Sequence, residues 1–176
     1  MHDLFGKASL LIKIGILLAV LTILMGFSFG IMFGEYEAKV EQKLENKAEK
    51  VLDTVYEGDT DLMNRSVRGA MNYFKRAHIH GNGLGIASLV LITALFLFCQ
   101  TNFLRDVTAL LLGIGALGYS SYWMIAGKMA PSLGGISQAR EAVGWYATFS
   151  AFLCLAGVVL TLIVFIIAAF MGKNKA

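Results

Sequence analysis

The sequence predicts an all-α integral membrane protein, a four-helix bundle with a protruding helical hairpin between spans 1 and 2. Of its 176 residues, 57% are hydrophobic and only 15% are charged, and the mean hydropathy is +0.67. A soluble domain carries about 25% charged residues. A chain this short has too little interior to hide so much apolar surface from water, so we expect lipid to be its solvent.

Four apolar segments are long enough to cross a bilayer, whose hydrocarbon core of about 30 Å requires about 20 helical residues. They cover about 8–33, 84–103, 107–127 and 142–171. The last segment is long enough that it must tilt or extend beyond the membrane. An even number of spans places both termini on one side and the hairpin on the other. The chain therefore divides into 1–34 (first span), 35–80 (extramembrane hairpin) and 81–176 (three further spans).

The hairpin is predicted from two amphipathic halves of the polar segment 35–80. Apolar residues recur every three or four positions in each half, and neighbouring Lys and Glu residues are expected to pair at i,i+4. Glu57-Gly58-Asp59 forms the predicted turn, after which Thr60 or Asp61 caps the second helix. The two stripes consist of Tyr36, Val40, Leu44, Ala48, Val51 and Val55, and of Met63, Val67, Met71 and Phe74. Because this hairpin has no third layer of its own, we expect it to pack against a partner or against another copy of the chain.

The connections predict how neighbouring spans pack. The short segment Thr101–Asp106 makes spans 2 and 3 antiparallel neighbours. The segment Lys128–Glu141 reads as a turn, because it contains glycines and Pro131, at which a helix is expected to end. In the first span, Gly26, Gly30 and Gly34 form a GxxxGxxxG ridge, which lets helices approach closely in lipid. That ridge serves packing within the chain, homo-oligomerisation or docking to other membrane subunits.

Location and activity are less strongly constrained. A short basic amino terminus precedes the first apolar run and resembles an uncleaved signal anchor, which favours cytoplasmic termini. The compact form of the chain suits a bacterial inner membrane. Cys99 and Cys154 lie inside apolar segments without zinc-type spacing. No nucleophile pattern, phosphate-binding loop or nucleic-acid-binding patch occurs, so we do not expect an enzyme on its own or a nucleic-acid partner.

A small polar constellation lies where the hairpin meets the second span. His78 and His80, two of the three histidines, occur in RAHIHGNGLG, residues 76–85. On a regular helix the two side chains point about 200° apart, so they share a metal only if Gly81 and Gly83 loosen the backbone. The later spans bring Met124, Met129 and Glu141 to the same level of the membrane. These residue types are ligands for copper or haem iron. An interfacial histidine pair without any ligand, or a quinone or lipid site, fits the same residues.

The stretch RAHIHGNGLG also resembles the Arg-Ala-His-x-His-x-x-x-Leu-Gly stretch of haem-bearing membrane proteins related to oxidase and nitric-oxide-reductase subunit I. The resemblance covers ten residues and implies that His78 or His80 binds haem b or copper. The chain departs from those proteins because it has about four spans and no further histidine in any span.

Two functions follow as hypotheses. In the first, the chain is a small membrane subunit of a redox or respiratory assembly, in which His78 and His80 bind a haem or metal with Met124, Met129 or Glu141 as further ligands. In the second, it is a cofactor-free structural, interaction or sensory membrane protein that acts through its hairpin and its glycine ridge.

Overall fold

The computed structural model describes residues 6–100 and 102–171. Over these residues the chain is all-helical, as predicted, and four of its helices are long and apolar enough to cross a membrane. The helices with defined bounds are α2 (Leu10–Glu49), α3 (Leu52–Val55), α4 (Thr60–Phe98), α5 (Phe103–Leu133) and α6 (Ile136–Met171).

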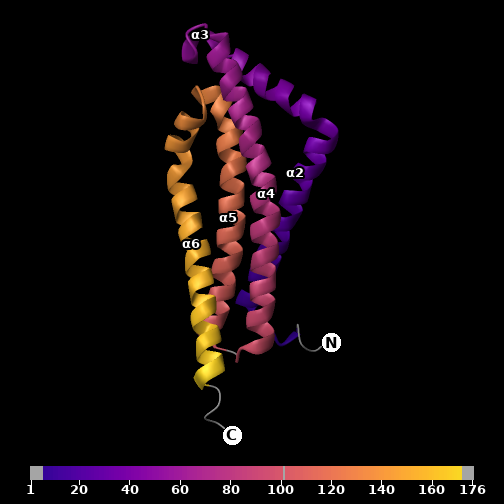
Figure 1. Ribbon diagram of the computed structural model, residues 1–176, viewed down its shortest axis with the longest axis vertical. Coiled ribbons are helices and arrows are strands. Elements are labelled where there is room, and N and C mark those ends of the chain that lie inside the picture. The colour runs from indigo at the N-terminus through magenta and orange to yellow at the C-terminus, as the bar shows by residue number, and fades with distance from the viewer. Residues whose placement is uncertain (1–5, 101, 172–176) are drawn as a thin grey trace.

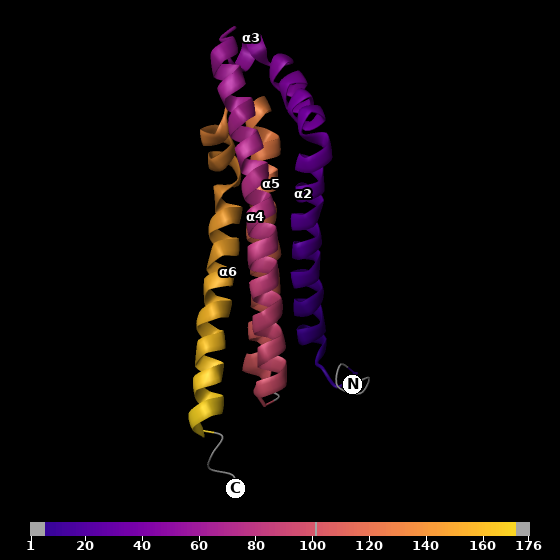
Figure 2. The ribbon, with the colours of Figure 1, turned by 45° about the vertical axis from the view of Figure 1, so that its right-hand side comes forward.

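The long helices form a layered bundle with α4 and α5 at its centre (Figures 1 and 2). Helix α2 packs against both α4 and α5 on one side, whereas α6 packs mainly against α5 on the other. Helix α2 begins and α6 ends at the same end of the bundle, which we call the terminal end. The short helix α3 lies at the opposite end, which we call the hairpin end.

Both helices that border the hairpin are longer than the predicted spans. Helix α2 continues to Glu49 beyond a kink at Tyr36, where φ is −133° and ψ is 15°; we call residues 37–49 the arm. Helix α4 runs without interruption through residues 80 and 81, so the second half of the predicted hairpin and the predicted second span are one helix. Its cap is Asp59, whose carboxylate accepts a hydrogen bond from the Leu62 amide at 2.8 Å, rather than Thr60 or Asp61.

The predicted hairpin has a third layer within its own chain, which the last turns of α5 supply. The second predicted stripe and the middle of the first meet in one core, which the last turns of α5 complete, whereas Tyr36 and Val55 of the first stripe are exposed. The Tyr56 hydroxyl, almost fully buried, donates to the Pro131 carbonyl at 2.6 Å, and the Ser66 hydroxyl donates to the Ala130 carbonyl at 3.2 Å. The buried members of this core include Leu44 and Ala48 of the arm, Met63, Val67, Met71 and Phe74 of α4, and Tyr122, Ala126 and Ala130 of α5.

The α5–α6 connection is much shorter than predicted. Pro131 lies inside the last turn of α5, and only Gly134 and Gly135 separate the two helices. Their φ values of 94° and 138° are in the left-handed region, which glycine adopts without strain. Proline lacks an N–H and so costs this last turn one helical hydrogen bond. Its own carbonyl, which lies at the helix end, accepts a hydrogen bond from the Tyr56 hydroxyl.

Glycines set the close approach of α2 to α4. A Cβ atom on Gly81 would lie 2.8 Å from the Gly26 Cα, and a Cβ on Gly30 would lie 2.9 Å from Cε1 of His78. These distances leave no room for a side chain, so two of the three ridge glycines are used within the chain. A Cβ on Gly34, in contrast, would meet nothing within 4 Å.

Candidate functional site at the hairpin end

His78 lies in the seam between α4 and α2. Its Nδ1 is 2.7 Å from the Gly26 carbonyl oxygen. Because a carbonyl only accepts hydrogen bonds, Nδ1 carries the proton and donates a hydrogen bond to the Gly26 carbonyl of α2. The ring also covers Gly30, and the Asn82 side-chain nitrogen lies 3.3 Å from the same Nδ1. His78 therefore fastens α4 to the small-residue face of α2.

His80 lies on a different side of α4, against α5. Its ring stacks on Trp123 with ring centres 5.1 Å apart and an angle of 25° between the planes, and its edge meets Tyr119 at 5.4 Å. Its Nδ1 donates to the Arg76 carbonyl at 2.9 Å. The Arg76 guanidinium lies 5.0 Å from the centre of the Trp123 ring, within the range of a cation–π contact.

The two histidines are therefore not brought together. Helix α4 is regular through Gly81 and Gly83, so the 200° separation of i and i+2 applies. His78 contacts α2 and His80 contacts α5, so the two imidazoles do not converge on one point of the described structure. Each ring uses Nδ1 in a backbone hydrogen bond and leaves Nε2 as the atom that could bind a metal from outside. In the part of the chain that the structure describes, no group of three His, Cys, Asp or Glu side chains is arranged to hold a metal.

The other predicted ligands lie in two further places. Met124 and Met129 line a groove of about 500 Å³ that also includes Lys47 of the arm. Glu141 is exposed and lines a separate, more polar groove of about 520 Å³ between α5 and α6, beside Arg140 and the phenol of Tyr122. No contact joins these residues to either imidazole among the described interactions.

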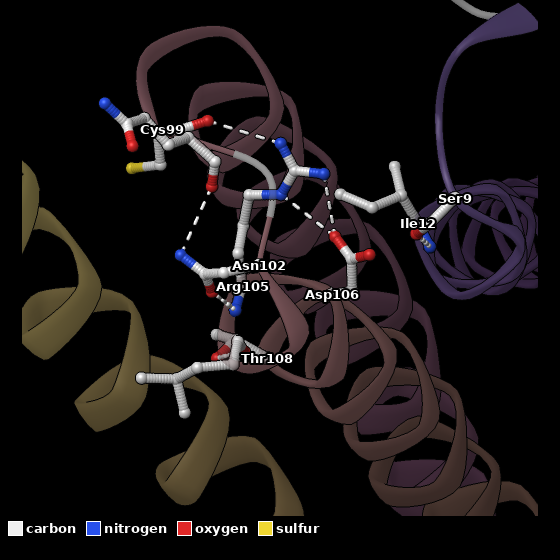
Figure 3. Close-up of polar contacts among 9 residues, drawn as sticks. Ser9, Ile12, Cys99, Asn102, Arg105, Asp106 and Thr108 are labelled. Carbon is white, nitrogen blue, oxygen red and sulfur yellow. Dashed lines mark hydrogen bonds and ion pairs between the residues drawn. The ribbon is translucent and has the colours of Figure 1, made fainter.

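A buried ion pair at the terminal end escaped the sequence analysis (Figure 3). The Arg105 guanidinium donates through Nε and Nη2 to Oδ1 of Asp106, at 2.9 and 2.8 Å, and through Nη1 to the Cys99 carbonyl at 3.2 Å. Arg105 is only 3% exposed and Asp106 only 8%. The sequence shows Arg105 only as a basic residue near the end of a predicted span. No local pattern around it indicates that it is buried in the bundle.

This ion pair ties the end of α4 to the start of α5. The Asn102 side chain caps α5 by accepting from the Arg105 amide at 2.8 Å, and Asp106 lies in the first turn, where a carboxylate is favoured by the helix dipole. With its hydrogen bonds to Asp106 and to the Cys99 carbonyl, the cluster is suited to fixing the turn between the two helices rather than to a reaction.

Known proteins provide no further guide to the site. Comparisons with known protein families, with curated proteins and with solved structures found no match for this chain. Its function is therefore inferred from the geometry described above.

Proposed function

We propose that this chain is a four-span integral protein of a bacterial inner membrane, with cytoplasmic termini and an extramembrane helical cap, and that it acts as a cofactor-free structural or interaction subunit. The cap comprises the arm, α3 and the amino-terminal half of α4. Four apolar helices support the membrane assignment, and the short basic amino terminus ahead of the first apolar run supports the orientation.

One observation carries the cofactor-free part of the proposal: both histidines of RAHIHGNGLG are engaged in helix packing. His78 donates a hydrogen bond across the α2–α4 seam, and His80 stacks on Trp123 of α5. A redox subunit with a haem or copper centre is the weaker alternative. It would need a second ligand from another chain, because the methionines and Glu141 line separate grooves.

The interaction part rests on the surface that the bundle leaves uncovered. Helix α6 contacts mainly α5, and only 17% of its most apolar window is buried within the chain. Phe152, Leu155 and Leu162 are each at least 60% exposed on it. Gly34 is the one ridge glycine with open space beside it. In a membrane these surfaces face lipid or another subunit.

Crosslinking in native membranes, followed by size analysis in mild detergent, tests this role. We expect the chain to migrate in an assembly larger than a monomer and Gly34→Leu to reduce the crosslinked fraction without unfolding the bundle. A chain that remains monomeric both in the membrane and in detergent would contradict the interaction role.

Topology is tested by cysteine labelling of intact cells in a Cys99→Ser, Cys154→Ser background. A cysteine placed at Asp61 should react with a membrane-impermeant maleimide, whereas one placed at Lys7 should react only after the cells are opened. The reverse pattern would overturn the orientation, and labelling of a fully soluble chain would overturn the membrane assignment itself.

A further inference from the structure

A groove at the hairpin end combines an apolar floor with two lysines. It lies between the arm and the last turns of α5, and its volume is about 500 Å³. Lys47 comes from the arm and Lys128 from α5, and no acidic side chain is among the described residues that line it. The floor is formed by Met124, Ile125, Met129 and Leu133.

The arm segregates its charges so that its basic flank faces this groove. Like charges, not opposite ones, recur every three or four residues, which corrects the expected i,i+4 pairing. On a helix the two rows lie on opposite flanks of the buried residues Leu44 and Ala48. Glu37 faces α4, where it pairs with Lys75 at 3.1 Å, whereas Lys47 faces α5. The basic row is Lys39, Lys43, Lys47 and Lys50, and the acidic row is Glu37, Glu41, Glu45 and Glu49.

The position of the groove along α5 matches the headgroup layer of a bilayer. Lys128 directly follows residue 127, where the third apolar segment ends. At 1.5 Å per residue, the floor from Met124 to Leu133 rises by about 14 Å, from the edge of the hydrocarbon core through the polar layer. An acyl chain lying along α5 would therefore place its phosphate beside the two lysines.

We propose that this groove binds the headgroup of an anionic phospholipid from the surrounding bilayer. Lys47 and Lys128 neutralise the phosphate, and the apolar floor receives the glycerol and the first methylenes. A basic groove at the bilayer surface attracts such headgroups through charge, and a lysine near an anionic membrane surface contributes about 1 kcal/mol. The inference rests on the membrane insertion proposed above.

The test uses the full chain reconstituted into vesicles of equal parts phosphatidylcholine and phosphatidylglycerol. After mild-detergent extraction, native mass spectrometry measures the lipids that each chain retains and their affinities. We expect preferential retention of phosphatidylglycerol, weakened about 5-fold by Lys47→Gln or Lys128→Gln and about 30-fold by both. The melting midpoint should stay at the wild-type value, because both substitutions remove only charge from a solvent-accessible groove.

The matched control is Arg65→Gln with Arg68→Gln, which removes the same charge from exposed residues of α4 outside the groove. This variant should keep wild-type lipid retention. Equal loss in both double variants, or no preference for phosphatidylglycerol in the wild type, would overturn the lipid site. Binding of a polyglutamate peptide instead of the lipid would overturn it in favour of an acidic protein partner. A wild-type chain that fails to enter the vesicles would overturn the proposed membrane function instead.

Discussion

At the terminal end of the bundle, Arg105 and Asp106 are buried together and hydrogen-bonded, whereas at the hairpin end the charged residues Arg140, Glu141 and Lys128 remain exposed. The hairpin end instead buries uncharged polar groups, such as the Tyr56 hydroxyl, against backbone carbonyls. The two ends thus close the bundle by different means, one by an ion pair and the other by an aromatic and methionine-rich core.

This difference shows that the rarity of a residue in the sequence is a poor guide to how deeply the fold depends on it. The histidine pair draws attention because the chain has only three histidines, yet both rings are half-buried packing residues. The ion pair looks ordinary in sequence, yet it is the more buried of the two features. Substitutions at each end should therefore differ in cost.

The largest effect is expected at the terminal end. Asp106→Ala leaves the Arg105 guanidinium buried without its counter-ion, and we expect a loss of about 3–5 kcal/mol in the free energy of unfolding. The double variant Arg105→Met, Asp106→Leu removes both charges and should lie within about 1 kcal/mol of wild type. Reversible unfolding in mixed detergents measures both. A single variant as stable as wild type would show that the pair is not buried.

A somewhat smaller effect is expected in the α2–α4 seam. Gly81→Leu forces the two helices apart and should cost about 1–3 kcal/mol. Its control is two residues away: a Cβ on Gly83 meets nothing within 4 Å, so Gly83→Leu should be neutral or stabilising by up to about 1 kcal/mol. Thermal melting in mild detergent separates the two, and equal midpoints would contradict the close approach of the helices.

His78→Ala should cost about 1 kcal/mol, because it removes one hydrogen bond between helices and the cover over Gly30. The same melting experiment detects this loss. An unchanged midpoint together with a loss of bound metal or colour would instead support the redox alternative.

The smallest effect is expected for His80→Phe, which keeps the stacking on Trp123 and loses only the hydrogen bond to the Arg76 carbonyl. We expect the melting midpoint to show a change in the free energy of unfolding of no more than about 0.5 kcal/mol. A loss as large as that of Gly81→Leu would show that the imidazole has a role other than packing.

The helices were predictable because long apolar runs and three- or four-residue stripes leave a strong signal. The ends of the helices were not predictable. Apolar composition shows that a segment avoids water, but it does not show where the backbone hydrogen bonds of a helix stop. The hairpin and the second span were predicted to divide at residues 80 and 81, but α4 is continuous there, because the α2–α4 packing that requires Gly81 outweighs the cost of glycine in a helix. Pro131 likewise predicted an earlier end to α5, which in fact continues to Leu133.

The site was predictable only in part. The 200° separation of His78 and His80 follows from helical geometry, but which helix each ring contacts depends on the packing of α2 and α5. The burial of Arg105 and Asp106 depends on how α4 turns into α5, which no local pattern encodes. The groove of Lys47 and Lys128 joins residues 81 positions apart, one of them on the arm that follows the kink at Tyr36.

The most direct test of the cofactor-free account is the absorption spectrum and metal content of the wild-type chain, extracted from its native membrane in mild detergent. The account predicts no Soret band and no stoichiometric iron or copper, with the same spectrum in the His78→Ala, His80→Ala double variant. A Soret band or stoichiometric copper that disappears in the double variant would contradict it and establish the histidines as ligands.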